Sequence, residues 1–144
     1  MKIKLKKVYY CDFCKKHGLT SWAIKKHEKH CTLNPNRECG LCDKKGVDKE
    51  GIKFIQKAYK KMKSHQGKDG ASEDGIIGTF VGKFEEAVKK LAKDLGCPVC
   101  TFSVLRQSEI GLHWMNYDFK EEMKKYWEEE AEEEQEREYY SNLI

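Results

Sequence analysis

The chain has 144 residues, of which 39% are hydrophobic and 36% are charged, so its length suits one compact domain or two small ones with a modest apolar core. The sequence has no run of about 18 apolar residues, which excludes a membrane-spanning helix, and the alternating lysines of MKIKLKKVYY are unlike a signal peptide. We therefore expect the protein in a reducing cytoplasm, either of its own cell or of a host cell. In such a compartment cysteines bind metal more often than they form disulfides, and the chain has seven of them.

The net charge of +4 conceals an uneven distribution along the chain. Residues 1–65 carry a net charge of +12, residues 66–117 carry −1 and residues 118–144 carry −7. A basic front and an acidic end indicate different partners for the two ends, or one end that docks on the other.

Hydrophobic patterning predicts a mostly helical chain. Residues 2–10 alternate between lysine and apolar side chains, which favours a short strand. Apolar residues at helical spacing predict five helices, in chain order over residues 20–30, 52–63, 80–95, 101–111 and 117–140. The polar, glycine-rich stretch 67–78 favours a mobile loop.

Four candidate metal ligands lie close together near the start of the chain. They are Cys11, Cys14, His27 and Cys31, with two, twelve and three residues between neighbours. Zinc takes four tetrahedral nitrogen or sulfur ligands. A Cys-x-x-Cys turn presents two thiolates to one point, and two ligands four residues apart share one face of a helix. His30 competes with Cys31 for the fourth position, and the spacing favours Cys31.

Residues 9–31 resemble the two-Cys, two-His zinc finger family, in its variant with Cys as the last ligand. Tyr9 stands where the family has an aromatic residue, and Ile24 stands where it has a core leucine. Leu19 departs from the pattern, because it lies one place beyond the usual core aromatic. The resemblance implies an N-terminal ββα-like zinc finger, for which we expect residues 1–36.

A second set of four candidate ligands consists of Cys39, Cys42, Cys97 and Cys100. These two Cys-x-x-Cys pairs resemble the four-Cys motif of zinc ribbons and treble-clef folds, although 54 residues separate them. We expect one metal to close residues 37–117 into a helical body. Two alternatives stay open: a redox-active pair at Cys97 and Cys100, and a cross-braced arrangement in which ligand pairs interleave between two zinc ions.

Together these patterns predict a small α+β protein, mostly α, that is stabilised by two zinc ions and ends in an acidic helix over residues 118–144. We expect residues 118–127 to pack on the body near Cys97 and Cys100 through an apolar stripe. The glutamates from Glu128 onward should project into solvent. Both metal sites would have full protein ligation, whereas a catalytic zinc keeps an open position, so we expect no enzyme activity.

Basic and aromatic side chains around the first site favour nucleic-acid binding. The candidate contact residues are Lys15, Lys16, Lys25, Lys26 and Trp22. The family reads bases from helix positions that fall here on Thr20, Ala23 and Lys26. None of these is the Arg, Asn or Gln that makes bidentate base contacts, so the sequence predicts weak specificity for DNA or RNA.

The alternative is a zinc-stabilised module for protein–protein interaction or structure, with the acidic C-terminal helix as its contact surface. Small zinc proteins rich in lysine and glutamate resemble many phage and viral products. The sequence predicts no membrane partner, and it does not fix the oligomeric state.

Overall fold

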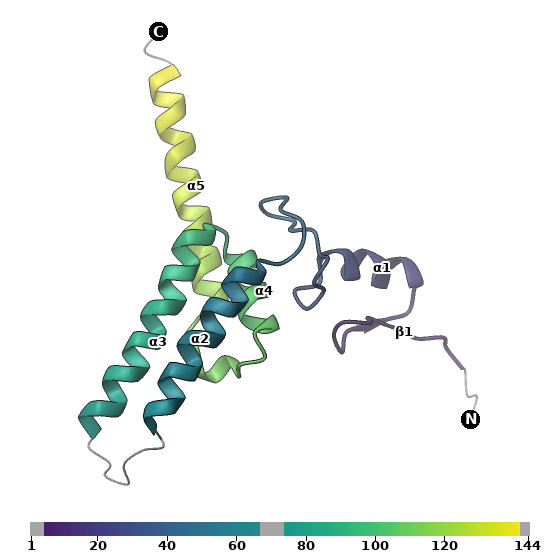
Figure 1. Ribbon diagram of the computed structural model, residues 1–144. Coiled ribbons are helices and arrows are strands. Elements are labelled where there is room, and N and C mark those ends of the chain that lie inside the picture. Colours follow the sequence, from purple (N-terminus) through teal and green to yellow (C-terminus); the bar gives the residue numbers. More distant parts are fainter. Residues whose placement is uncertain (1–4, 67–73, 142–144) are drawn as a thin grey trace, which may run out of the picture.

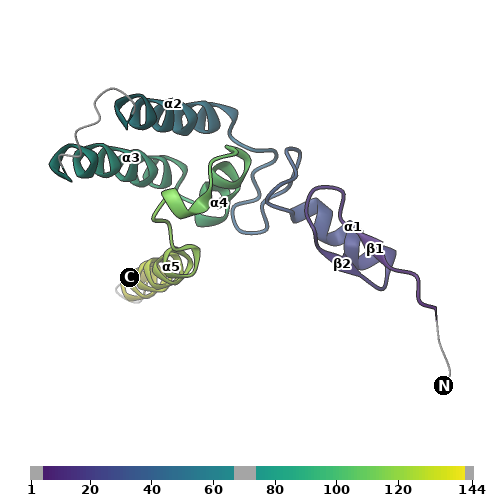
Figure 2. The same ribbon diagram turned by 90° about the horizontal axis from the view of Figure 1, so that it is seen from below.

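The computed structural model describes residues 5–66 and 74–141 and confirms a mostly helical α+β chain (Figures 1 and 2). Its elements follow in the order β1 (Tyr9–Tyr10), β2 (His17–Gly18), α1 (Ser21–His30), α2 (Lys49–Gln66), α3 (Asp74–Leu95), α4 (Pro98–Gln107), the short 3-10 helix η1 (Leu112–Trp114) and α5 (Phe119–Ser141). Within these described ranges, none of the helices has the length and apolar character needed to cross a bilayer.

The N-terminal module has the predicted order of two strands and one helix. Strands β1 and β2 pair antiparallel, with Tyr9 opposite Gly18 and Tyr10 opposite His17. The hydroxyl of Thr20 caps α1 by accepting a hydrogen bond from the Ala23 N–H at 3.4 Å. The predicted strand over residues 2–10 was too long: residues 5–8 are not in a strand, because the returning strand offers partners only to Tyr9 and Tyr10, and residues 1–4 lie outside the described range.

Helices α2, α3 and α4 form the hydrophobic core of the body, in which α2 and α3 lie side by side (Figure 1). The fully buried side chains include Ile55 and Met62 of α2, Phe84 of α3 and Val104 of α4. Met115, just after η1, also lies in this core. The helical apolar stripes that predicted α2 and α3 are the faces that the structure buries.

Several helix boundaries differ from the prediction: α2 is three residues longer at each end, α4 ends at Gln107 and not at residue 111, and α3 and α4 both begin earlier than expected. Helix α3 begins at Asp74, so the loop predicted over residues 67–78 was wrong for residues 74–78, whereas residues 67–73 lie outside the described range. A glycine costs about 1 kcal/mol in the interior of a helix, but Gly75 lies in the first turn of α3, where backbone N–H groups have no intrahelical partner in any helix. Helix α4 begins at Pro98, because proline fits the first helical position, where its missing N–H is not needed.

Helix α5 packs on the body through its first turns only. The Phe119 ring stacks on Phe102 of α4 with centroids 4.7 Å apart, and the Tyr117 hydroxyl donates to the Pro98 carbonyl at 3.2 Å. Trp127 is 56% exposed, so its predicted place in the buried stripe was wrong. From Glu128 to Tyr139 every described side chain is exposed, and α5 extends away from the body (Figure 1).

The segment after α1 is tied to α4. The Thr32 carbonyl accepts hydrogen bonds from the Ser103 hydroxyl at 2.7 Å and from Gln107 Nε2 at 2.8 Å. Arg106 Nη1 donates to the Thr32 hydroxyl at 2.7 Å. Three side chains of one helix therefore hold the end of the N-terminal module against the body.

We expect the two halves of α5 to differ in their effect on stability. Phe119→Ala should lower the free energy of unfolding by about 1 kcal/mol or more, because it removes an aromatic pair and its buried area. Truncation after Trp127 should leave the free energy of unfolding unchanged, since the side chains from Glu128 to Tyr139 are exposed. Urea denaturation of both variants measures the difference, and an equal loss in both would contradict this division of the helix.

Candidate metal centres

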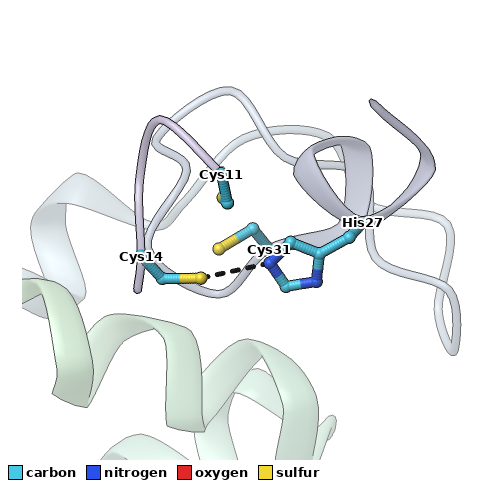
Figure 3. Close-up of side chains that lie close together, drawn as sticks. All are labelled: Cys11, Cys14, His27 and Cys31. Carbon is cyan, nitrogen blue, oxygen red and sulfur yellow. Dashed lines mark hydrogen bonds between the residues drawn. The ribbon is translucent and has the colours of Figure 1, made fainter. Parts of the chain in front are cut away.

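The first four predicted ligands form one compact cluster (Figure 3). The ligand atoms of Cys11, Cys14, His27 and Cys31 all lie within 4.8 Å of one another. Cys14 Sγ lies 3.2 Å from His27 Nε2. Cys11 and Cys31 are 6% and 2% exposed, so the sulfur atoms are largely shielded from water. This cluster could hold a metal ion.

A tight turn positions the first two thiols. The Cys11 N–H donates to the Lys16 carbonyl at 2.9 Å, and the N–H groups of Phe13 and Lys16 point at Cys11 Sγ and Cys14 Sγ, each at 3.4 Å. Backbone N–H groups directed at sulfur stabilise the thiolate form, which is the form that binds metal.

Helix α1 supplies the other two ligands from its C-terminal end. His27 and Cys31 lie one helical turn apart, whereas the rival His30 turns away and its Nδ1 pairs with the Glu38 carbonyl at 2.9 Å. Ile24 is the one buried residue of this helix and packs against the cluster, with Leu33 beside it. Leu19 is 60% exposed and takes no part in this small core.

The second cluster joins two distant parts of the chain. The sulfur atoms of Cys39, Cys42, Cys97 and Cys100 lie within 4.8 Å of one another. Cys39 Sγ is 3.7 Å from Cys97 Sγ, and Cys42 Sγ is 3.4 Å from Cys100 Sγ. This arrangement has the ligands in two sequential sets of four and does not have the interleaved order of a cross-braced site.

A tight turn positions Cys39 and Cys42, and the first turn of helix α4 positions Cys97 and Cys100. The Cys39 N–H donates to the Lys44 carbonyl at 2.9 Å, the Leu41 N–H points at Cys39 Sγ at 3.4 Å, and Asp43 takes a left-handed conformation with φ of 55°. Cys97 is the N-cap residue of α4, and Cys100 lies in its first turn. All seven cysteines are free thiols, and each belongs to one of the two clusters.

Electrostatics in the second cluster favour a bound cation. Burial opposes ionisation of Cys39, but the N–H groups of Cys42 and Leu41 and the neighbouring thiols outweigh it and lower its pKa to about 6. Burial raises the pKa of Cys97 and Cys100, and the negative charge on Cys39 raises both further. A divalent cation removes this mutual repulsion and lets all four sulfurs ionise.

The first cluster has a neutral nitrogen ligand. Burial, with the nearby charge of Lys16, lowers the pKa of His27, so its ring is neutral near pH 7 and its Nε2 lone pair can bind a metal. Burial raises the pKa of Cys31, which must lose its proton when a metal binds.

Arg37 is a buried residue that the sequence pattern did not single out. It is 1% exposed, and its Nη1 donates to Cys100 Sγ at 3.8 Å. A Zn²⁺ ion with four thiolates carries a net charge of −2, so a guanidinium beside one sulfur offsets part of the excess charge. Its place between Cys31 and Cys39 was the one available signal, because a residue between two sets of ligands is close to both.

The predicted nucleic-acid contacts lie on the outside of the N-terminal module. Lys15 and Lys16 follow the Cys11–Cys14 turn, and Lys25 and Lys26 lie on α1; all four are exposed. Trp22 is 70% exposed, and Lys26 Nζ lies over its ring, 5.3 Å from the centroid. Comparison of the chain with known protein families, with curated proteins and with solved structures gives no match.

We expect two metal ions per chain. Elemental analysis after gel filtration should give two for the native chain and one each for Cys14→Ser and Cys97→Ser. Cys14→Ser should leave the helical body folded, whereas Cys97→Ser should lower its unfolding midpoint strongly, because metal binding at such sites contributes directly to folding. A native ratio of one, or a disulfide between cluster residues in reducing buffer, would refute two four-ligand centres.

Metal affinity should fall as the pH falls. The raised pKa values of Cys31, Cys97 and Cys100 mean that these thiols carry protons at neutral pH, and metal binding must displace them. Protons therefore compete with the metal. Calorimetric titration in two buffers of different ionisation enthalpy should show net proton release at pH 7, and an affinity that does not change with pH would contradict this ligand set.

Proposed function

We propose that this chain is a zinc-binding, non-enzymatic protein that contacts nucleic acid with low sequence specificity through its N-terminal finger. The observation that carries the proposal is the exposed Trp22 with Lys26 over its ring, on a helix whose other face carries a candidate metal ligand. The finger thereby presents an aromatic surface and positive charges on one rigid support.

Zinc is the metal that suits both donor sets. One cluster offers three sulfurs and one imidazole nitrogen, and the other offers four sulfurs. Zinc favours tetrahedral sites of these two compositions. Four protein ligands leave no position for a reactive water, which supports a structural role for the metal over a catalytic one.

Four lysines of the finger suit phosphate binding, because no acidic side chain in the described part of the chain pairs with them. Within residues 5–66 and 74–141, Lys15, Lys16, Lys25 and Lys26 form no ion pair, whereas the neighbouring Lys29 pairs with Glu38 at 2.7 Å. Stacking on an exposed aromatic ring and attraction of phosphates are the two contributions that bind single strands without sequence preference.

Low specificity follows from the three helix positions that the zinc finger resemblance assigns to base contacts. The Thr20 hydroxyl is occupied by the Ala23 N–H as the helix cap. Ala23 has no polar side-chain atom, and Lys26 lies over Trp22. These positions therefore present no Arg, Asn or Gln side chain to a base edge, and the one lysine among them lies over an aromatic ring.

Protein–protein interaction is the second candidate, and the acidic half of α5 favours it. Eight glutamates lie between residues 128 and 138, and every side chain of this stretch is exposed. A helix of this charge suits a basic partner. Nucleic-acid binding that depends on salt and is lost with a chelator distinguishes the first candidate from this one.

The test of the proposed function uses a labelled single-stranded oligonucleotide and fluorescence anisotropy at several salt concentrations. The variant K15Q/K16Q/K25Q/K26Q should bind far more weakly at low salt, and the slope of log affinity against log salt should fall by about 0.7 per lost phosphate contact. Trp22→Ala should lose about 1–3 kcal/mol of binding free energy with little change in slope.

The matched control is K120Q/K124Q/K125Q/R137Q on α5. It also removes four positive charges, but from a helix that is distant in sequence from the finger. This control should bind as the native chain does. If it loses as much affinity as the finger variant, overall charge explains the binding. If the native chain does not bind the oligonucleotide or a duplex, the proposed function fails and the interaction module is the better explanation.

A further inference from the structure

Helix α2 carries a row of lysines on the side that faces away from the core. Lys53, Lys57, Lys60 and Lys61 line a shallow groove together with Gln56 and Ser64. The opposite side of the helix, with Ile55 and Met62, is buried in the body. The packing of α2 therefore fixes which way the lysines face.

This row has little acidic charge nearby on its own helix. Glu50, which pairs with Lys53 at 2.8 Å, is the last acidic residue of α2, and residues 51–66 contain neither Asp nor Glu. The lysines of α5 provide the contrast, because Lys124 pairs with Glu128, and Lys125 pairs with both Glu121 and Glu122. Residues 51–66 thus carry a net positive charge in sequence, whereas the lysines of α5 lie among a larger number of glutamates.

We propose that the lysine row of α2 is a second nucleic-acid contact, which binds the phosphate backbone of a strand held by the finger. Lys53, Lys57 and Lys61 are four residues apart and so lie about 6 Å apart along the helix, with Lys60 beside Lys61, and together they offer a line of positive charge to a polyanion. This inference rests on the proposed function and adds a second site to it.

The chemistry of the row favours a polyanion over other partners. Lysine is depleted in the cores of protein interfaces, which need apolar or aromatic anchors, and the groove is lined by lysine, glutamine and serine only. Insertion of α2 into a membrane surface would need an apolar helix face, and the apolar face of α2 is already buried in the body. Phosphate binding needs positive charge alone.

Helix α4 contacts both the end of the finger and helix α2, which carries the lysine row. Ser103, Arg106 and Gln107 of α4 bind Thr32 at the end of the finger, and α4 also packs against α2. A strand that contacts both surfaces therefore gains the second contact without a large additional ordering cost.

The test compares K57Q/K60Q/K61Q on α2 with the charge-matched control K120Q/K124Q/K125Q on α5. All six lysines are exposed, so both variants should fold, and circular dichroism checks this. With a long labelled single strand, the α2 variant should lower the salt slope by about 2, from about 0.7 for each of three contacts. The control should keep the native slope.

An oligonucleotide of about four nucleotides, near the lower limit for a single-strand site, should bind both variants alike, because it cannot reach both surfaces. Equal slopes for the two variants on the long strand would overturn the inference and leave the finger's role intact. A changed oligomeric state of the α2 variant with unchanged nucleic-acid affinity would overturn it in favour of a second copy's acidic α5. Failure of the native chain to bind any strand would end both proposals.

Discussion

Four sulfur atoms from two segments 54 residues apart share one small volume, and the rest of the body depends on that meeting point. Thiolates repel one another at such distances, and burial makes the repulsion stronger. Burial, and in addition the negative charge on Cys39, raise the pKa of Cys97 and of Cys100. A divalent cation held by the four sulfurs would remove the repulsion and would join the start of the body to α4.

Helix α4 connects the two candidate metal centres. Its first turn provides Cys100, and its later turns provide the side chains that bind Thr32, directly after the last ligand of the finger. Arg37, between the two sets of ligands, is buried and reaches Cys100. A change in the position of Cys97 or Cys100 would therefore shift α4 and, with it, the hydrogen bonds that hold Thr32 at the end of the finger. This constraint explains why the finger has a defined position although its own hydrophobic core is very small.

Much of the architecture could be predicted because metal-ligand spacing and helical periodicity are local signals. The two ligand sets and the helices α1, α2 and α5 follow directly from residues such as Cys11, His27 and Ile55. The predictions that failed relied on local sequence preferences that contacts elsewhere in the fold override. Gly75 favoured a loop but lies in α3, and Trp127 continued an apolar stripe where no surface of the body covers it. For the buried Arg37 the one signal was its place between the two sets of ligands, and the Thr32 contacts had none, because they depend on which segments meet in space.

The two candidate centres differ in the length of chain that must be synthesised before all four ligands are present. The first set of ligands spans 21 residues, and the second spans 62. Loop-closure entropy favours the shorter span. During synthesis all four ligands of the finger are present before most of the body has been made. Cys39 and Cys42, in contrast, have no partner ligands until Cys97 and Cys100 have been synthesised. The nascent chain thus passes through a stage with one finished centre and one exposed pair of thiols. This pair is the point at which oxidation or a wrong metal competes with correct folding.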